Sequence, residues 1–507
     1  MPQTVIILDF GGQYKELIAR RVRELGVYSE ILPCTVSMQE LRDKAPIGII
    51  FTGGPDSVNA PDSPACDPAV FKMGIPVLGI CYGMQFLCHA LGGTVVPCEK
   101  SEYGTLPLTA DPDSRFFRGL PAEQRVLMSH TDRVERLPDG FTATAHTDLC
   151  PVAAMENTSR RFYAVQFHPE VENTVYGRDM LHTFLYDICG AAGDYSMEDY
   201  LARAIQEVRA QVGDEHVLLG LSGGVDSSVC AALLSRAIPH HLTCIYIDHG
   251  FMRKNETEEV RRAFAGRELD LRIIDASEQF LSALKGVSEP EQKRKIIGRE
   301  FARAFEKAAR ECGRPAYLAQ GTIYPDVVES GKNKSAVIKS HHNVGGLPAD
   351  LGFKGVVEPL KGLFKDEVRR LGHSLGLPRE LVERQPFPGP GLAIRTLGEV
   401  TPEKLSILRE ADAIVRYEIG RSRAKADQYF CVLTNARSVG VMGDFRTYEY
   451  TVAVRAVRTN DFMTCEYARL PHTLLQRISS RITGEVAGVN RVVYDITGKP
   501  PATIEWE

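Results

Sequence analysis

Short apolar runs alternate with helix-forming stretches in the first part of the chain, and this order constrains the fold more than any other feature. The runs "TVIILDF", "IGIIFTGG" and "IPVLGICYG" are typical of buried strands, whereas "KELIARRVREL" and "MQFLCHALGG" have helical periodicity. Strands that alternate with helices usually pair in parallel, because each helix returns the chain to the start of the next strand. The first part is therefore predicted to form a mostly parallel α/β sheet.

A second rhythm of the same kind follows the small and polar stretch "GAAGDYSMEDY", and we expect a domain boundary near residue 193. The segment "HVLLGLSGGVDSSVCAALLSRAI" predicts a strand, a loop and a helix, and "LTCIYIDHG" predicts the next strand. The pattern continues to about residue 381. A chain of 507 residues is too long for one hydrophobic core, so a second domain is expected here.

The cluster "QPFPGPGL" at 385–392 cannot form a regular helix and predicts a rigid linker. After it, Thr401 and Pro402 are expected to open a helix that Gly420 closes, and "YEYTVAVRAV" and "RVVYDIT" alternate like half-buried strands. The prediction is two doubly wound parallel-sheet α/β domains, followed by a small α+β domain. Their expected bounds are 1–193, 194–382 and 383–507.

Composition excludes several classes of protein. The formal charge of −5 gives no basic surface for nonspecific binding of nucleic acid. The beginning of the chain, "MPQTVIILDF", lacks the basic and apolar regions of a signal peptide, and no apolar run is long enough to span a bilayer. The 12 cysteines include no C-x-x-C pair, which argues against a disulfide framework and a zinc knuckle. We expect a cytoplasmic protein that binds neither nucleic acid nor membranes.

Cys81 stands in "GICYGMQ", where a buried strand turns sharply into a helix. A buried cysteine most often packs as a small apolar residue. The glycines at 79 and 83 would also permit a tight, strained turn that presents a nucleophile at the top of the sheet. The residues around Cys81 do not decide between these two interpretations.

The segment "QFHPE" favours the nucleophile. A thiol needs a neighbouring base at neutral pH, and the imidazole of that base needs a carboxylate to fix its tautomer. His168 and Glu170 follow the short strand "YAVQF", and residues two apart on an extended chain point the same way. Backbone donors for the oxyanion of a tetrahedral intermediate would come from Gly54 in "FTGGP" and from Tyr82 at the helix start.

In this order, "TGGP", "GICYGMQ" and "QFHPE" resemble the class I, triad-type glutamine amidotransferases over about 170 residues. The resemblance implies that Cys81 attacks the carboxamide of glutamine, forms a glutamyl thioester and releases ammonia. In the same comparison His168 is the general base and Glu170 orients it.

The string "LLGLSGGVDSS" joins a predicted strand to a predicted helix. Small residues and bare N–H groups at a helix N-terminus form a cradle for an anion, although a glycine pair alone is more often a turn. The chain contains no G-x-x-x-x-G-K-[ST] motif. "SGGVDSS" resembles the signature of the ATP pyrophosphatases. This resemblance implies ATP binding by Ser222, Gly223, Gly224, Val225, Asp226, Ser227 and Ser228, with Asp226 close to a Mg²⁺ ion.

The tail suggests the acceptor of the ammonia. "GTIYPDVVES", "IKSHHNVGGLP", "RQPFPGPGLAIR", "SVGVMGDFRTYEY" and "KPPATIEWE" resemble the GMP synthetase family, and the resemblance covers essentially the whole chain. It implies adenylation of xanthosine 5′-monophosphate (XMP), amination to GMP, and a homodimer through the last domain. The implied XMP contacts are Arg294, Asp444, Arg446, Lys499 and Glu505, and Lys339 and Lys361 are weaker candidates for ATP phosphates.

The chain departs from the family pattern at Thr131, where glycine is more frequent, and at Gly362, where glutamate is common. These departures affect only the expected local loop shape or the expected helix start at residue 362. Asparagine synthetase needs an N-terminal cysteine, and residue 2 here is proline. Transfer-RNA thiolases use related loops together with extra cysteines. The second domain of this chain contains no cysteine pair of that kind. A nucleotide-binding regulator without catalysis is the alternative from another class, and the intact motifs argue against it.

Overall fold

The computed structural model describes residues 2–313, 315–330, 352–459 and 464–507. The chain separates into two compact units, Met1–Tyr200 and Leu201–Glu507. The predicted boundary near 193 lies close to this division, whereas the predicted boundary at 382/383 lies inside the second unit. The division into three domains therefore stays a prediction.

The first unit contains a nine-stranded sheet in the order β2-β1-β3-β4-β9-β8-β7-β5-β6. Its strands are β1 (Thr4–Asp9), β2 (Tyr28–Pro33), β3 (Gly48–Phe51), β4 (Val77–Ile80), β5 (Thr94–Ala110), β6 (Glu123–Arg136), β7 (Thr142–His146), β8 (Ala154–Asn157) and β9 (Phe162–Val165). Its helices are α1 (Lys15–Glu24), α2 (Met38–Asp43), α3 (Tyr82–Ala90) and α4 (Gly177–His182), with a 3-10 turn at Pro68–Lys72 and a π-helical turn at Thr183–Ile188.

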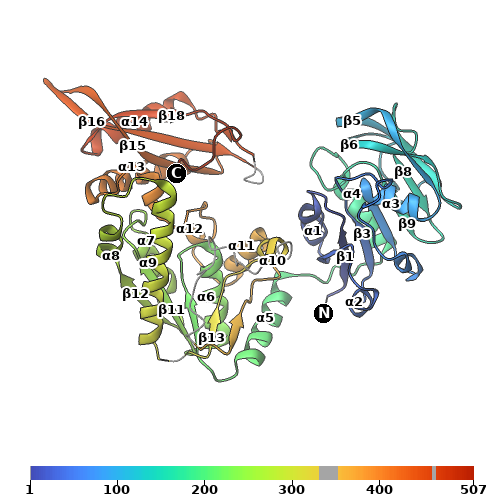
Figure 1. Cartoon of the computed structure of the whole chain (residues 1–507), viewed down its shortest axis with the longest axis horizontal. Helices are drawn as coiled ribbons and strands as arrows, with labels where there is room; N and C mark the ends of the chain where they lie inside the picture. The colour runs from blue at the N-terminus through green and yellow to red at the C-terminus, as the bar shows by residue number, and fades with distance from the viewer. Residues whose placement is uncertain (1, 314, 331–351, 460–463) are drawn as a thin grey trace. The chain divides into compact units, whose positions relative to one another are not determined.

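Only half of this sheet is parallel. Strands β2, β1, β3, β4 and β9 pair in parallel, and α1 and α3 lie on opposite sides of β1 and β3 (Figure 1). Strands β8, β7, β5 and β6 add antiparallel pairs at one edge. The expected α/β fold is confirmed, but the long strands β5 and β6 form an antiparallel extension that the expectation of a mostly parallel sheet did not include.

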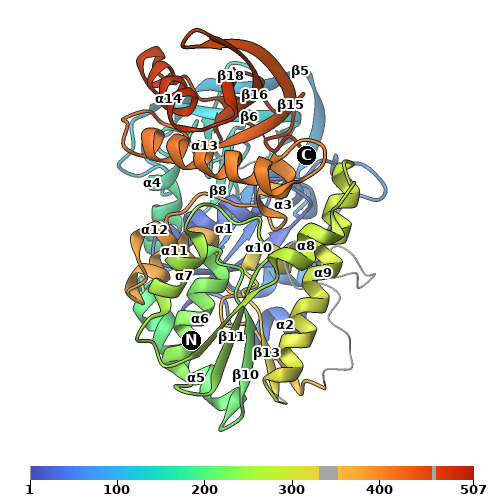
Figure 2. The same ribbon diagram turned by 90° about the vertical axis from the view of Figure 1, so that its left-hand side faces the viewer.

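The second unit contains the predicted second parallel sheet, with strand order β12-β11-β10-β13-β14. The strands are β10 (Val217–Gly220), β11 (Leu242–Asp248), β12 (Asp270–Asp275), β13 (Tyr317–Ala319) and β14 (Gly355–Val357). The helices are α5 (Met197–Val212), which crosses the unit boundary, and α6 (Val225–Ala237), α7 (Glu256–Phe264), α8 (Ser277–Ala283), α9 (Pro290–Glu311), α10 (Tyr324–Ser330), α11 (Lys365–Ser374) and α12 (Arg379–Val382). Helices α6 and α9 lie on opposite sides of the strands (Figure 2), as in a doubly wound fold.

The C-terminal part of this unit is a third sheet with two helices. Its elements are α13 (Pro402–Gly420), β15 (Gln428–Met442), β16 (Phe445–Arg458), β17 (Glu466–Tyr467), α14 (His472–Glu485) and β18 (Val489–Asp495). Thr401 caps α13 by accepting a hydrogen bond from the Lys404 N–H, and Gly420 ends the helix, as predicted. Strand β16 pairs antiparallel with β15 and β17 and parallel with β18.

Strand β16 is buried on both faces over residues 450–457, so the expectation of a half-buried strand was wrong for it. Val452 and Val454 pack into the larger core of the unit, whereas Ala453 and Val457 pack into a second cluster with Ile504. The face that the sequence pattern left open to solvent is thus covered by the end of the chain. Strand β18 keeps the expected alternation.

The predicted rigid linker at 385–392 is packed against the second parallel sheet. The Leu392 N–H donates to the Phe251 carbonyl over 2.8 Å, and both side chains belong to one apolar core with Val452. Its last two residues also begin a 3-10 turn, Gly391–Arg395. One continuous core therefore joins the second and third sheets, because the proline-rich segment carries buried side chains.

Two glycines bring β4 and α3 into close contact around Cys81. A Cβ atom on Gly79 would lie 2.6 Å from the Gly83 carbonyl oxygen, and one on Gly83 would lie 2.5 Å from the Phe51 carbonyl oxygen. Neither glycine has a positive φ, so their role is close approach and not the turn itself. Because backbone atoms stand in the way, no side-chain rotation can relieve these contacts.

Gly83→Ala is expected to destabilise the first unit by about 1–3 kcal/mol, the usual cost of overpacking. Gly298→Ala in α9 is the matched control, because a Cβ there has nothing within 4 Å. Alanine in a free helical position should be neutral or stabilising by about 0.5–1 kcal/mol. Calorimetric unfolding of both variants measures the difference, and an unchanged Gly83→Ala transition would contradict the close contact.

Candidate functional site

Cys81 lies between β4 and α3 with a strained backbone, at φ 53° and ψ −108°. A non-glycine residue rarely adopts this conformation, and such strain concentrates at functional sites. The Cys81 N–H donates to the Val165 carbonyl of β9 over 2.8 Å, which holds the turn against the neighbouring strand. The Cys81 side chain is buried, and its thiol faces the Ser129 carbonyl at 3.7 Å. This is the geometry of a cysteine presented at the carboxyl end of a sheet.

His168 and Glu170 form a buried pair beside this cysteine. The distance between His168 Nδ1 and Glu170 Oε1 is 2.8 Å. Burial opposes a charged ring, but the carboxylate of Glu170 and the hydrogen bond with the Cys81 side chain hold the pKa of His168 well above its usual value. The thiol, the imidazole and the carboxylate thus form one chain of interactions, as cysteine nucleophiles require.

His168 and Glu170 lie together for a different reason from the one that the sequence predicted. Strand β9 ends at Val165, so His168 and Glu170 lie in the loop that follows and are not neighbours on one strand face. The loop is fixed by hydrogen bonds: Thr174 Oγ1 donates to the His168 carbonyl over 2.6 Å, and Arg21 Nε donates to the Glu170 carbonyl over 3.1 Å. Tertiary contacts therefore place the pair.

The glycine loop after β3 approaches the same point. A Cβ on Gly54 would lie 3.0 Å from Tyr82 Cγ, and a Cβ on Gly53 would lie 3.4 Å from His168 Cε1 and 3.7 Å from Cys81 Cβ. Tyr82 is the first residue of α3, where N–H groups have no acceptor inside the helix. The structure brings Gly54 and Tyr82 together as expected, and it adds Gly53, which the sequence reasoning missed although it stands in the same "TGGP" motif.

The phosphate-type loop lies between β10 and α6 in the second unit. Gly224 is the N-cap residue of α6, and Gly223 has a φ of 75° that favours glycine. The Ser222 and Ser227 hydroxyls lie 2.9 Å apart, and the Gly224 N–H donates to Ser222 Oγ over 3.3 Å. Val225 and Ser228 are buried on the helix. Hydroxyl groups and N–H groups at this helix start can accommodate an anion.

Two cations that the sequence reasoning missed adjoin this loop. Lys365, the first residue of α11, lies 2.7 Å from both carboxylate oxygens of Asp226. Arg384 donates to the Gly223 carbonyl and pairs with the buried Glu256 at 2.7 Å. Lys365 follows Lys361 by four residues, so the same "PLKGLFKDEV" segment carried the signal. Lys361 is exposed, and Lys339 lies outside the described residues.

Asp226 fits the expected Mg²⁺ ion in part. Mg²⁺ in nucleotide sites is usually held by one or two carboxylates together with substrate phosphates, so a single aspartate beside a phosphate cradle suffices. Both Asp226 oxygens face the Lys365 ammonium. If a metal ion took the place of this ammonium beside Asp226, Lys365 would have to turn toward the phosphates.

The five expected XMP contacts fall into two groups. Arg294 donates to the Glu507 carbonyl, and Glu505 accepts two hydrogen bonds from the buried Arg395, at 2.8 and 3.0 Å. Lys499 is half-buried, and its backbone pairs with Cys465. These three residues belong to the tail and its anchor on α9.

Asp444 and Arg446 lie elsewhere, at the exposed turn between β15 and β16. This turn is at the free end of the ribbon, away from the C-terminus (Figure 1). Neither side chain forms an ion pair within the described part of the chain. The structure therefore brings Arg294 and Glu505 to one region and leaves the hairpin pair apart from it.

Family models match three parts of the chain. Residues 6–188 match glutamine amidotransferase class-I, residues 196–390 match NAD synthase, and residues 418–506 match the GMP synthase C terminal domain. The GMP synthase [glutamine-hydrolyzing] of Finegoldia magna is 56% identical, with 100% of this chain and 99% of the relative covered. That of Carboxydothermus hydrogenoformans is 57% identical, with full coverage of both.

A solved structure also resembles part of the chain. The crystal structure of a putative GMP synthase protein from Thermoplasma acidophilum is 34% identical, and the match covers 41% of this chain and 98% of that one, with a TM-score of 0.34.

Glu170→Gln is expected to lower the pKa of His168. The variant removes the carboxylate charge that raises this pKa, while the burial that lowers it stays. At a given pH a smaller fraction of His168 will then be protonated. Nuclear magnetic resonance of histidine-labelled protein measures the shift, with His168→Gln to assign the signal. Glu172→Gln, whose side chain is 84% exposed, is the control, and an equal shift there would contradict the specific role of Glu170.

Proposed function

Because the chain belongs to the family of glutamine-hydrolysing GMP synthases, it makes GMP with nitrogen from glutamine and with ATP, and we propose that two sites divide this work. Residues of the first unit release ammonia, and residues of the second unit activate the acceptor. The observation that carries this assignment is the Cys81, His168 and Glu170 chain on one unit and the 222–228 loop on the other.

In the first site Cys81 is the nucleophile. Its sulfur attacks the carboxamide carbon of glutamine, and His168 accepts the thiol proton. The oxyanion that forms is held by N–H groups of the Gly53–Gly54 loop and of Tyr82. When the intermediate collapses, His168 gives the proton to the leaving nitrogen, so that ammonia departs and a glutamyl thioester remains. Water then attacks the thioester with His168 as base, and glutamate leaves.

Glu170 keeps His168 in the tautomer that this sequence needs. Its Oε1 atom accepts the Nδ1–H hydrogen bond, so the Nε2 atom is left to exchange protons with Cys81. The carboxylate also stabilises the imidazolium that forms during attack. Because the pKa of His168 is raised, the ring takes up a proton readily, as the general base for Cys81 must.

In the second site the 222–228 loop holds the phosphates of ATP. The C2 oxygen of XMP attacks the α-phosphate, pyrophosphate leaves, and ammonia then displaces AMP from the adenylated carbon to give GMP. The N-terminus of α6 favours the negative charge of the phosphates, and Lys365 and Arg384 add two cations beside it. Asp226 would hold Mg²⁺, which supplies charge neutralisation on the pyrophosphate when it is bound.

The tail supplies groups for XMP. Lys499 offers an ammonium for the nucleotide phosphate, and Arg294 on α9 offers a guanidinium. Glu505 accepts hydrogen bonds from Arg395. It would therefore either position Arg395 beside XMP or leave Arg395 and bind XMP itself. Asp444 and Arg446 remain candidates for XMP contacts. They could contact the nucleotide only if it bound near the hairpin between β15 and β16.

The third sheet carries a surface suited to a homodimer. Val439, Val441 and Tyr448 are 60%, 73% and 62% exposed, although they are apolar or aromatic. Val439 lies directly opposite Tyr448 in the β15–β16 register, and Val441 is two residues along, so the three side chains share one face of the ribbon. Arg446 lies directly opposite Val441 on this face, so exposed apolar side chains stand beside a cation there. Apolar side chains exposed together in this way are typical of an interface.

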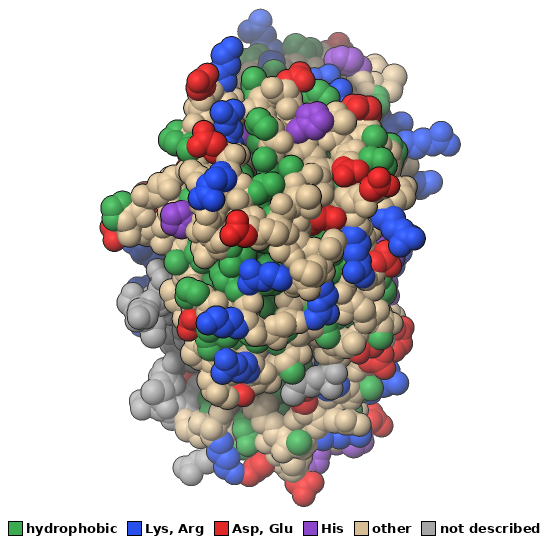
Figure 3. All heavy atoms as spheres, turned by 90° about the vertical axis from the view of Figure 1, so that its right-hand side faces the viewer, with side chains coloured by type: hydrophobic (Ala, Val, Ile, Leu, Met, Phe, Trp, Pro, Cys, Tyr) green, Lys and Arg blue, Asp and Glu red, His purple; other side chains and the backbone are tan. Residues whose placement is uncertain are grey.

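The remaining expectations concern compartment and partners. All 12 cysteines are free thiols, as is usual in the reducing cytoplasm. Within the described residues no helix has the length and apolarity to cross a bilayer. On the face drawn in Figure 3, basic and acidic side chains are interspersed, and neither sign forms a continuous patch. We propose glutamine, ATP, XMP and a second copy of the chain as the partners, on the basis of the family relationship.

Cys81→Ala is expected to reduce glutamine-dependent GMP synthesis at least about a thousandfold, as the loss of a nucleophile does in other triads. Ammonia-dependent synthesis should stay close to that of the parent, because the ATP site lies on the other unit. Asp226→Asn gives the complementary pattern, with both nitrogen sources affected. Assays with glutamine and with ammonium salt separate the two sites, and equal losses with both sources in Cys81→Ala would refute the division.

Val441→Glu is expected to convert a dimer into monomers, because a charge on the shared face of β15–β16 would have to be desolvated at the interface. Sedimentation velocity measures the mass, and Leu149→Glu is the control, since Leu149 is 43% exposed on the other unit. A dimer that survives Val441→Glu would place the interface elsewhere.

A further inference from the structure

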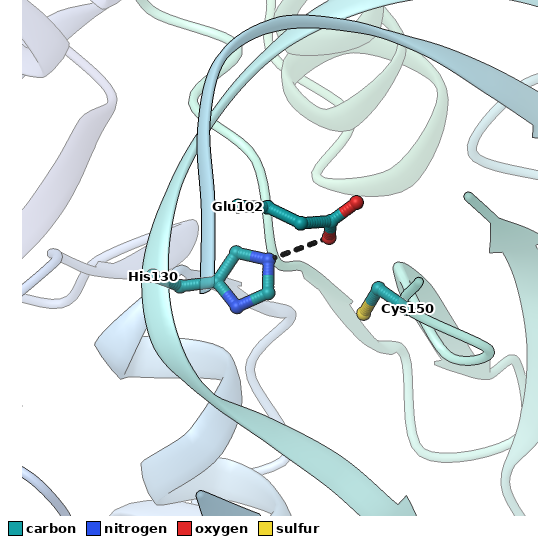
Figure 4. A group of neighbouring side chains, drawn as sticks. All are labelled: Glu102, His130 and Cys150. Carbon is teal, nitrogen blue, oxygen red and sulfur yellow. Dashed lines mark hydrogen bonds and ion pairs between the residues drawn. The ribbon is translucent and has the colours of Figure 1, made fainter. Parts of the chain in front are cut away.

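Three potential metal ligands meet inside the antiparallel extension of the first sheet. Glu102 is on β5, His130 is on β6, and Cys150 lies in the loop between β7 and β8 (Figure 4). One ligand atom from each residue lies within 4.8 Å of the others, and all three residues are buried. None of them belongs to the Cys81 chain, and the mechanism above leaves them without a role.

The hydrogen bonds of His130 indicate that a cation lies between its Nε2 atom and the Glu102 carboxylate. The Nδ1 atom lies 3.0 Å from the Asp132 carbonyl oxygen, which can only accept, so Nδ1 carries a proton. The Nε2 atom lies 2.9 Å from Glu102 Oε2. In the neutral ring Nε2 is an acceptor, and two acceptors this close need a cation between them. That cation is either a proton or a metal ion.

The surroundings match those of histidine and carboxylate ligands in metal sites. A ligating histidine usually donates its second N–H to a carbonyl or carboxylate, as His130 does to Asp132. The other oxygen of Glu102 accepts a hydrogen bond from Thr147 Oγ1 over 2.7 Å. The same hydroxyl accepts from the Cys150 N–H over 2.9 Å, so one threonine positions two of the three ligands.

We propose that Glu102, His130 and Cys150 bind a zinc ion, which takes the place of the proton between the carboxylate and the imidazole. A thiolate, an imidazole and a carboxylate are the three ligand types that zinc prefers. At bond lengths of about 2.0–2.3 Å, tetrahedral ligands lie about 3.3–3.8 Å apart. The Glu102 oxygen and the His130 nitrogen, now 2.9 Å apart, must therefore separate slightly when the ion binds.

Zinc binds the thiolate form of cysteine and would take the place of the proton between Glu102 and His130, so its binding releases protons.

The site adjoins the segment that faces the nucleophile. The Ser129 carbonyl faces the Cys81 thiol, and the Asp132 carbonyl accepts a hydrogen bond from Gln85 of α3 over 2.9 Å. A metal ion on His130 would therefore fix residues 129–132 beside the glutamine site. This consequence is independent of which substrate the second unit uses.

The test is metal binding to the full-length chain in a Cys81→Ala background, which removes the thiol beside His168 and Glu170 as a competing ligand. Co²⁺ replaces Zn²⁺ as the spectroscopic probe, and Zn²⁺ affinity is measured by competition with the bound Co²⁺. We expect one Co²⁺ per chain, with the visible bands of a tetrahedral site and a near-ultraviolet sulfur-to-cobalt band.

Variants of two of the ligands separate this site from other thiols. Cys150→Ala should remove the sulfur band, and Glu102→Gln should weaken binding about tenfold or more. Cys88→Ala is the matched control, because Cys88 is equally buried in the same unit and donates to the Arg136 carbonyl instead. Cys98→Ala is the second control, because Cys98 Sγ lies 3.8 Å from Nδ1, on the other side of the His130 ring.

A readout that needs no ligand variant covers the case in which these substitutions unfold the unit. X-ray absorption of the zinc-loaded Cys81→Ala chain should show one sulfur ligand at about 2.3 Å and nitrogen or oxygen ligands at about 2.0–2.2 Å. A zinc environment without sulfur, binding that survives Cys150→Ala, or the absence of Co²⁺ binding at neutral pH would each overturn the proposal.

Discussion

The close contact between β4 and α3 is the constraint on which the first site depends. Gly79 and Gly83 let backbone meet backbone, and Cys81 between them takes up the strain at φ 53°. Conformations of this kind persist only where the surroundings determine them, and here the bond from the Cys81 N–H to Val165 and the contact of Gly83 with Phe51 do so. The same contact sets Tyr82 at the helix start, where its N–H has no acceptor inside the helix.

The second site depends on charges that the fold gathers around one helix terminus. The positive end of α6 meets Asp226, whose carboxylate is neutralised by Lys365, while Arg384 is held by Glu256 and by the loop carbonyl at Gly223. A negative ligand at this loop would compete with Asp226 for Lys365 and with Glu256 for Arg384. Two cations thus lie beside the N-terminus of α6, the end of a helix that favours an anion.

The end of the chain is bound to the second unit by buried charges. Lys293 is fully buried, donates to the Thr396 carbonyl over 2.8 Å and pairs with the Glu507 carboxylate. Burial lowers the pKa of Lys293, although Glu507 opposes that shift. Arg395 pairs with Glu505 and stacks 3.8 Å over the Phe430 ring. Removing one partner of a buried ion pair lowers the free energy of unfolding by about 3–5 kcal/mol. The tail is therefore held firmly against the second unit.

Local patterns in the sequence determined the elements and most of the candidate groups. Alternating apolar runs predicted both parallel sheets, Thr401 and Gly420 predicted the bounds of α13, and the motifs around Cys81, His168 and Asp226 were recognisable because their residue types carry the chemistry. Tertiary structure alone decided which distant groups meet. Lys365 and Arg384 contact the 222–228 loop, and Ile504 covers the open face of β16. Glu102, His130 and Cys150 come together only when the strands of the antiparallel extension pair. The physical reason is that a sequence pattern reports the burial of one residue at a time, whereas an ion pair or a ligand set is a distance between residues that only the packed chain fixes.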